Sequence, residues 1–198
     1  GGQSAWKSAK LDLAKAAATV VSDTDTTTVR VLSQRNVILL ESARGVSLNG
    51  VSGIVLDRDG KPISNWVSEA KTGKRGELLC LQQNIPGNAD VSGMDIFVVA
   101  GREGTKQAIA LVTSRESQQP LEEAVKLVET TLKDTNAVAD HEAAWETFWS
   151  RSGVSLGDPT LQNWWYRMVY FLRTFARPGG NVISLQAAFD QLGGWHNS

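Results

Sequence analysis

The stretch that decides the fold of this chain is residues 141–198, which read HEAAWETFWSRSGVSLGDPTLQNWWYRMVYFLRTFARPGGNVISLQAAFDQLGGWHNS. Five of the seven tryptophans of the chain lie in it, namely Trp145, Trp149, Trp164, Trp165 and Trp195. Aromatic side chains have large apolar surfaces that are normally buried. The stretch is therefore expected to need a large apolar surface to pack against.

The clearest helix in the sequence lies in the middle of this stretch. Asp158 is a residue type that caps helices, and Pro159 suits the first helical position. Apolar residues then recur at helical spacing at Leu161, Trp164, Trp165, Met168, Leu172 and Phe175, and Val169, Tyr170 and Phe171 widen the stripe. Because Pro178 cannot continue a helix, the pattern predicts a helix from Pro159 to Ala176 or Arg177, buried on most sides.

The motifs of this stretch follow one another in a particular order. They are W-x-x-F-W-x-x-S from Trp145, D-P-x-L and then W-Y from Asp158, R-P-G from Arg177, L-Q-x-x-F from Leu185, and G-x-W-H from Gly193. This order resembles the entry into the catalytic barrel of the glycoside hydrolases of family 95, the α-L-fucosidases and their relatives. The earlier run LDLAKAAATVVSDTDTTTVRV, residues 11–31, is similar to the family's lead-in to paired sandwich strands.

The resemblance implies a domain order. Members of the family have an N-terminal β-supersandwich, a helical linker and an (α/α)6 barrel. We therefore expect an α+β chain, with an antiparallel β-sandwich over residues 1–116, linker helices over 117–152 and the first part of the barrel over 153–198. The chain is then expected to be a truncated piece of a longer enzyme.

Composition sets limits on the function independently of the resemblance. The hydrophobic content of 41% and the charged content of 21% are ordinary for a globular protein. The net charge of -1 predicts no general attraction to nucleic acid, and no apolar run is long enough to cross a bilayer. The compartment cannot be read from the single cysteine, although a polysaccharide-degrading parent enzyme is expected to be secreted or periplasmic.

The sequence pattern of residues 19–113 is typical of a β-domain. Short apolar or alternating runs occur at Thr27–Leu32, Asn36–Glu41, Ser52–Leu56, Glu77–Gln82, Met94–Val99 and Gln107–Val112. Turn signals separate them at Ser22-Asp23, Gln34-Asn36, Asn49-Gly50, Asp57-Gly60, Lys71-Gly73, Pro86-Asn88 and Gly101-Gly104. Short strands at this spacing are typical of a sandwich or barrel. Residues 3–17 fit two interpretations, a helix through Trp6, Ala9 and Leu13 or a strand at Leu11–Leu13.

Two further helices are predicted between the β-domain and the aromatic helix. Pro120 opens the first, in which Leu121, Ala124, Val125, Val128 and Leu132 face one way. The run 133–136, Lys-Asp-Thr-Asn, ends it. The second places Ala144, Trp145, Phe148 and Trp149 on one side and ends at Gly153. These helices correspond to the linker that the resemblance implies.

No pair of carboxyl groups in the chain fits glycoside hydrolysis, which usually needs one acid and one base or nucleophile. Glu142 and Glu146 share a helical face, but such a pair is more often solvated surface, and Asp190 is better explained as a hydrogen-bonding group in a loop. In the resembling enzymes the catalytic Glu and Asp fall later in the barrel. We therefore predict no catalytic residue within these 198 residues.

The resemblance implies that this chain contributes the edge of a sugar-binding pocket. Trp195 is predicted to stack on a pyranose face, and His196 to donate a hydrogen bond to a sugar hydroxyl. The alternatives are packing of Trp195 between helices and no role for His196. Gln186 matches the family pattern, whereas Ala187 stands where glycine is usual.

No metal site and no cofactor are predicted. His141 and His196 are too far apart in sequence to suggest a shared metal, and His141 is expected to cap or pack. The twelfth position from Asp57 is Ser68 and not Glu, which rules out an EF-hand there. Cys80 lies in the apolar run LLCL and is interpreted as a small buried hydrophobic residue.

The sequence thus leaves three functions open. The first is part of a carbohydrate-active enzyme, with an oligosaccharide or glycan as the substrate of the parent protein. The second is a non-catalytic β-sandwich binding module, and the third is an interaction domain that docks a partner through its aromatic helix. We also expect that this helix either packs back onto the rest of the chain or forms a homodimer, because such patches are seldom left in water.

Overall fold

The structure is a computed structural model that describes residues 5–50, 54–56, 62–65, 68–85 and 92–175. The chain divides into two compact units, residues 1–146 and residues 147–198. Each unit is described by itself.

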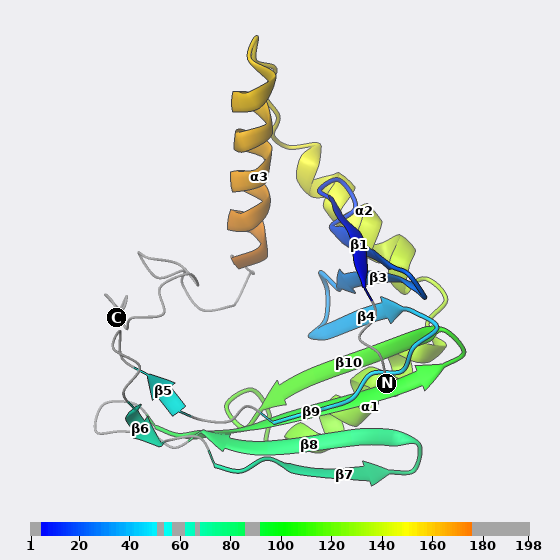
Figure 1. The fold of residues 1–198 in the computed structure, drawn as a ribbon, viewed down its shortest axis with the longest axis vertical. Coiled ribbons are helices and arrows are strands. Elements are labelled where there is room, and N and C mark those ends of the chain that lie inside the picture. The colour runs from blue at the N-terminus through cyan, green and yellow to red at the C-terminus, as the bar shows by residue number, and fades with distance from the viewer. Residues whose placement is uncertain (1–4, 51–53, 57–61, 66–67, 86–91, 176–198) are drawn as a thin grey trace. The chain divides into compact units, whose positions relative to one another are not determined.

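An eight-stranded antiparallel sheet is the centre of the first unit (Figure 1). Its strands are β1 (Trp6–Asp12), β2 (Ala17–Ser22), β3 (Thr26–Val31), β4 (Val37–Glu41), β7 (Lys71–Arg75), β8 (Leu78–Ile85), β9 (Met94–Glu103) and β10 (Lys106–Thr113). Their spatial order is β1-β2-β3-β4-β10-β9-β8-β7, and neighbouring strands run antiparallel. With the helices that follow, this sheet confirms the α+β class.

A separate hairpin consists of β5 (Ile54–Leu56) and β6 (Pro62–Asn65). These strands pair antiparallel across the predicted Asp57–Gly60 turn, whose residues 57–60 lie outside the described part.

The strand interpretation, made for Leu11–Leu13, is confirmed at Leu11 and Asp12, whereas Leu13 lies in the following turn, and the helix interpretation is wrong. Leu11 pairs with Ala18, and the rest of β1 continues this register along β2. Between the strands, Ala16 has a positive φ of 45° and the Lys15 amide donates to Asp12 Oδ1 at 3.1 Å. Pairing of β1 with β2 decides the outcome, because local helix propensity is a weak preference that tertiary contacts override.

The turn predicted at Lys71–Gly73 is also wrong. These residues belong to the edge strand β7, and the chain reverses at Gly76, whose φ is +59°. A Cβ added at Gly73 would contact nothing within 4 Å, so this glycine fits an open strand edge. In contrast, the turn predicted at Gly101–Gly104 is confirmed near its end, where Gly104 has a φ of +60°.

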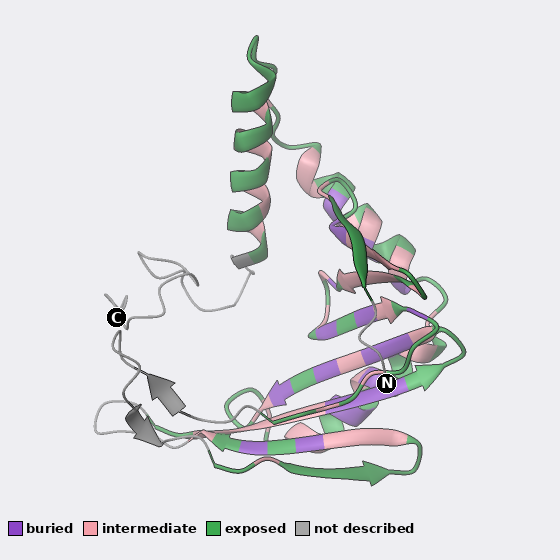
Figure 2. Ribbon diagram, viewed as in Figure 1, coloured by how far each residue is buried: buried purple, intermediate pink, exposed green. Residues whose placement is uncertain are grey.

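The hydrophobic core lies between one face of the sheet and the helix α1 (Pro120–Lys133) (Figure 2). Directly opposed residues in the register share a face, and Val37 opposite Ala110 and Leu39 opposite Ala108 are almost fully buried. From the helix, Ala124, Val125 and Val128 complete this core, as their spacing predicted. Glu122 and Glu123 lie in the first turn of α1, where acidic side chains favour the helix dipole.

Gly101 sets how closely α1 approaches the sheet. It lies inside β9, opposite Ala108 of β10. A Cβ at this position would come within 2.7 Å of Leu78 Cδ2 and Val128 Cγ1. Real Cβ contacts are essentially never that short, so the absence of a side chain is a packing requirement at Gly101.

The other face of the sheet is apolar too. Val31, Ile38 and Ile109 are directly opposed across β3, β4 and β10, and Leu111 lies on the same face. Val31, Ile38 and Leu111 are exposed. Gln107, also on this face, is buried, and its amide nitrogen donates to the Arg44 carbonyl at 2.6 Å. The segment after β4 therefore covers one end of this face, while the row around Ile38 stays open.

Two helices follow α1. The helix α2 (Ala137–Trp149) buries Ala137, His141 and Trp145. In the second unit, α3 (Pro159–Phe175) begins as predicted, because Asp158 Oδ1 accepts hydrogen bonds from the amides of Thr160 (2.7 Å) and Leu161 (3.3 Å). Its predicted end at Ala176 or Arg177 falls outside the described residues. No helix of the described part is long and apolar enough to cross a membrane.

Candidate functional site

The predicted sugar-binding residues Trp195 and His196 lie outside the described residues, as do Gln186, Ala187 and Asp190. Three features of the described part bear on function. They are the buried His141, the arrangement of the acidic residues and the surface of α3.

His141 joins α2 to the sheet. Its side chain is 1% exposed, although histidine is rarely buried to this degree. Nδ1 accepts a hydrogen bond from the Ser33 amide at 3.2 Å, and Nε2 lies 3.0 Å from the Lys15 carbonyl oxygen. A carbonyl only accepts, so the ring carries its proton on Nε2. Trp145, one turn later in α2, makes an edge contact with the ring at a centroid distance of 6.4 Å. The prediction that His141 packs is confirmed.

This geometry makes His141 a neutral structural group and leaves no nitrogen for a metal. Burial lowers the pKa of His141 below its ordinary value of 6.5, and the nearby Arg30 acts in the same direction. The hydrogen bonds to the Ala16 and Lys15 carbonyls, and the charge of Glu142, act against that shift. Among the described residues, no group of three or more His, Cys, Asp or Glu side chains could hold a metal ion.

The lowered pKa of His141 predicts a pH-dependent stability. Between the lowered folded pKa and about 6.5, the unfolded chain binds a proton that the folded chain does not, so the free energy of unfolding falls as the pH falls. The slope contributed by one such group is at most about 1.4 kcal/mol per pH unit. Urea unfolding of the wild type between about pH 7.5 and 5 should show this loss, which lies above the range in which carboxylates titrate.

The matched comparison is His141→Phe, which removes the titrating group and keeps a ring. Its free energy of unfolding should be lower overall but nearly independent of pH over the same range. Equal slopes for the two proteins would contradict a buried neutral His141.

Glu142 and Glu146, the only acidic pair on a shared helical face that the sequence suggested, do not form an acid–base pair. Glu142 lies 3.3 Å from Lys15 Nζ and 4.0 Å from an Arg30 nitrogen, and Arg30 also contacts Glu41 at 2.7 Å. Glu146 is exposed. Glu142 therefore helps hold α2 to the first strands, a role that the sequence did not reveal because its partners are more than 100 residues away in sequence.

The carboxyl groups with shifted pKa values, Asp25, Glu122 and Asp134, are poor general acids. The hydrogen bond from Ser42 lowers the pKa of Asp25, the hydrogen bond from Arg75 lowers that of Glu122, and the Asn136 amide, followed by Arg35, lowers that of Asp134. A general acid in glycoside hydrolysis needs a raised pKa. The described acidic residues with shifted pKa values are thus held ionised.

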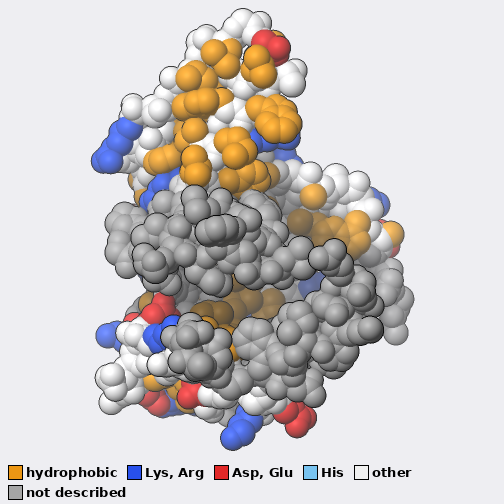
Figure 3. Space-filling view, turned by 90° about the vertical axis from the view of Figure 1, so that its left-hand side faces the viewer, with side chains coloured by type: hydrophobic (Ala, Val, Ile, Leu, Met, Phe, Trp, Pro, Cys, Tyr) orange, Lys and Arg blue, Asp and Glu red, His pale blue; other side chains and the backbone are white. Residues whose placement is uncertain are grey.

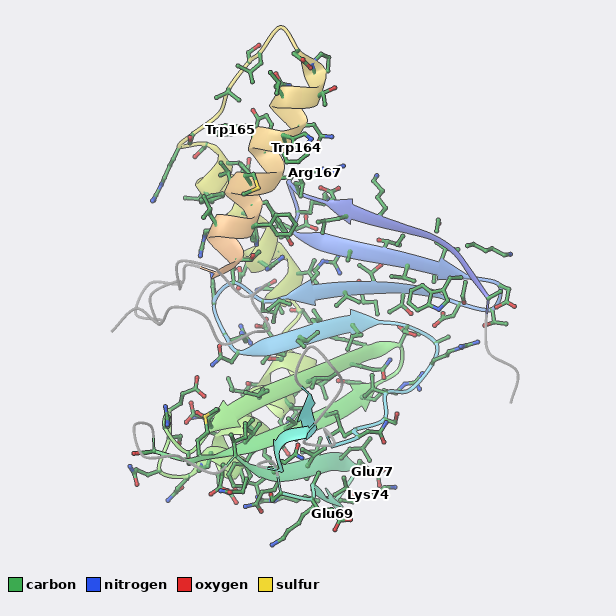
Figure 4. The ribbon with its side chains drawn as sticks, turned by 60° about the vertical axis from the view of Figure 1, so that its left-hand side comes forward. Glu69, Lys74, Glu77, Trp164, Trp165 and Arg167 are labelled. Atoms are coloured by element: carbon green, nitrogen blue, oxygen red, sulfur yellow. The ribbon has the colours of Figure 1, made fainter. Side chains whose placement is uncertain are left out.

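Acidic residues at the sheet edge are solvated. Figure 4 shows Glu69, Lys74 and Glu77 close to β7, and all three are exposed. Charged side chains on an edge strand commonly protect it from pairing with other chains. This group is explained by that role.

Cys80 packs against the core and remains partly exposed. Burial raises the pKa of its thiol, which keeps the thiolate scarce at neutral pH. The interpretation of Cys80 as a small hydrophobic residue therefore needs one change, since it is only half-buried.

The exposure of α3 differs more from its prediction than that of any other candidate feature. One face packs within the second unit, where Tyr166 lies 5.6 Å from the Trp149 ring and Arg173 lies 5.7 Å from the Phe148 ring. The opposite face bears exposed apolar residues, namely Leu161 (60%), Trp164 (63%), Met168 (52%), Phe171 (38%) and Leu172 (54%). We call these five residues the α3 seam. The prediction that α3 is buried on most sides is therefore wrong for the α3 seam, which is exposed in the single chain.

Figure 3 shows hydrophobic side chains gathered over α3, and Figure 4 labels Trp164, Trp165 and Arg167 on this helix. Arg167 is exposed as well. Aromatic residues and arginine are enriched at protein interfaces, so this is the described surface best suited to recognition.

Comparison with known proteins gave no match: no family model matches this chain, and no curated protein matches it by sequence. The resemblance to the family 95 glycoside hydrolases thus depends on sequence motifs alone, those of residues 141–198 and the weaker one of residues 11–31.

Proposed function

We propose that this chain is the non-catalytic sheet-and-linker part of a glycoside hydrolase related to the α-L-fucosidases of family 95. The observation that carries the proposal is the order of elements. An antiparallel sheet is followed by α1, which packs on the sheet, then by α2, and then by an aromatic helix capped by Asp158-Pro159. The motif resemblance implies the same order of sandwich, linker and first barrel helix.

The apolar second face of the sheet supports the sandwich part of the proposal. A sheet that is covered on one side only usually alternates apolar and polar residues, with the polar ones in water. In this sheet Val31, Ile38 and Leu111 are apolar and exposed opposite the core face. A second sheet layer of the parent enzyme would cover this row, as in two-sheet sandwiches.

The attachment of α2 supports the linker part. His141 and Glu142 fix this helix to the first strands and their turns through the hydrogen bonds of a buried ring and through ion pairs. A helix attached to the domain before it in this way is what a linker of that kind requires.

The substrate of the parent enzyme is proposed to be an oligosaccharide or glycan, with α-L-fucosides as the first candidates. Trp195 and His196 remain the proposed edge of its sugar pocket. The catalytic carboxyl pair would come from later parts of the barrel.

The chain alone is expected to have no activity. On an aryl-α-L-fucoside and a panel of aryl hexosides, its rate should equal the buffer blank, because the described carboxyl groups with shifted pKa values are ionised and hydrogen-bonded. Release of the aryl group can be followed by absorbance. Turnover above the blank that Glu142→Gln abolishes would show that the assignment of the acidic residues is wrong.

One observation favours the interaction module as the alternative. The exposed α3 seam is a surface that binds partners as readily as it would pack against barrel helices. A chain that binds a partner through this seam, and whose gene encodes no barrel, would support the alternative.

A further inference from the structure

We propose that the α3 seam is a self-association surface, on which the α3 seam of a second copy of this chain packs. This inference is independent of the proposed hydrolase, because it concerns what covers the helix when this chain is alone in solution.

The first support is the spacing of the seam. Leu161, Trp164, Met168 and Phe171 recur at intervals of three and four residues, which is the pattern of a narrow helix–helix seam. The opposite face of α3 is already used within the unit, where the Tyr166 hydroxyl donates to the Val154 carbonyl at 3.2 Å. The seam therefore points away from the contacts that hold α3 in its own unit.

The second support is the area. Five half-exposed large side chains offer about 500 Å2 per copy, or about 1,000 Å2 for a pair, which reaches the lower limit of specific interfaces. Such a patch is at the upper end of what monomers leave exposed. The expected dimer is weak, with a Kd in the micromolar range or above.

The third support is the charge on the helix. Residues 159–175 contain no acidic residue, and their only charges are Arg167 and Arg173. The seam itself is uncharged, so pairing two copies buries no unpaired ion. Arg167 flanks the seam on both copies, so added salt should leave the dimer unchanged or tighten it by screening this repulsion.

A second copy is the occupant that fits these features. An isologous pair presents the same apolar residues from both sides and closes on itself. An acidic partner would find only Arg167 beside the seam, and a polar ligand would bury the seam incompletely.

The test is sedimentation equilibrium of the full chain over about two decades of concentration around the micromolar range. The expected result is a monomer–dimer equilibrium. Trp164→Ser should weaken it about a hundredfold, since central tryptophans dominate such interfaces. Met168→Glu should do the same with helix propensity maintained, which far-UV circular dichroism checks. Trp6→Ser is the matched control, because Trp6 is 77% exposed on β1 and outside the seam.

The outcomes separate cleanly. A dimer that Trp164→Ser and Met168→Glu dissociate, while Trp6→Ser does not, supports the proposal. A chain that is monomeric at all concentrations contradicts the proposal. So does a dimer that persists in Met168→Glu or that also dissociates in Trp6→Ser. A dimer whose affinity falls severalfold with added salt contradicts it as well. None of these results bears on the glycoside hydrolase proposal, which depends on catalysis.

Discussion

His141→Ala is expected to lower the free energy of unfolding of the first unit by about 3 kcal/mol or more. The substitution removes a fully buried ring and leaves the Ser33 amide and the Lys15 carbonyl without their partner. Large-to-Ala changes of buried rings cost about 3–5 kcal/mol, and each buried polar group left unsatisfied costs about 1–3 kcal/mol. The measurement is the urea midpoint followed by circular dichroism.

Two variants make this result specific. Glu146→Ala, at an exposed position of the same helix, should change the stability by no more than about 0.5 kcal/mol. His141→Phe restores the ring volume without the hydrogen bonds, and it should recover only part of the loss. Full recovery by phenylalanine would show that the hydrogen bonds of Nδ1 and Nε2 do not contribute to stability.

Gly101→Val is expected to have an effect nearly as large. A side chain at this position meets Leu78 and Val128 at 2.7 Å, and Leu132 at 3.1 Å, so α1 must move away from the sheet. Overpacking of a filled core costs about 1–3 kcal/mol, and sometimes more. The same urea experiment measures it.

Gly73→Val is the matched control for this prediction. Both glycines lie in strands, but a Cβ at Gly73 has open space around it. Valine favours strands, so the control should be neutral or stabilising by up to about 1 kcal/mol. Equal destabilisation at the two positions would show that strand position, and not the approach of α1, explains the loss at Gly101.

Local patterns in the sequence predicted the elements that depend on local physics. The spacing of Leu121 to Leu132 predicted α1, and Asp158-Pro159 predicted the start of α3. The alternating runs predicted most of the strands with errors of a few residues at their ends. The class of the fold followed from these elements.

Features that depend on distant parts of the chain could not be predicted. Lys71–Arg75 is a strand because β8 pairs with it, although its lysines and glycine are typical of turns. Glu142 contacts Arg30 and Lys15, which no local pattern indicates. The α3 seam was predicted to be buried, because apolar periodicity indicates that a face needs a partner and does not identify that partner. The candidate sugar-binding residues Trp195 and His196 stay predictions.

The proposal on which the function depends is that this chain is the non-catalytic part of a glycoside hydrolase. The decisive experiment is to express the complete reading frame of the gene and to measure its hydrolysis of an aryl-α-L-fucoside and the panel of aryl hexosides beside that of the 198-residue chain. We predict turnover by the complete product on at least one substrate and a rate equal to the blank for the 198-residue chain. A complete product that turns over none of them, or a 198-residue chain that is active alone, would contradict the proposal.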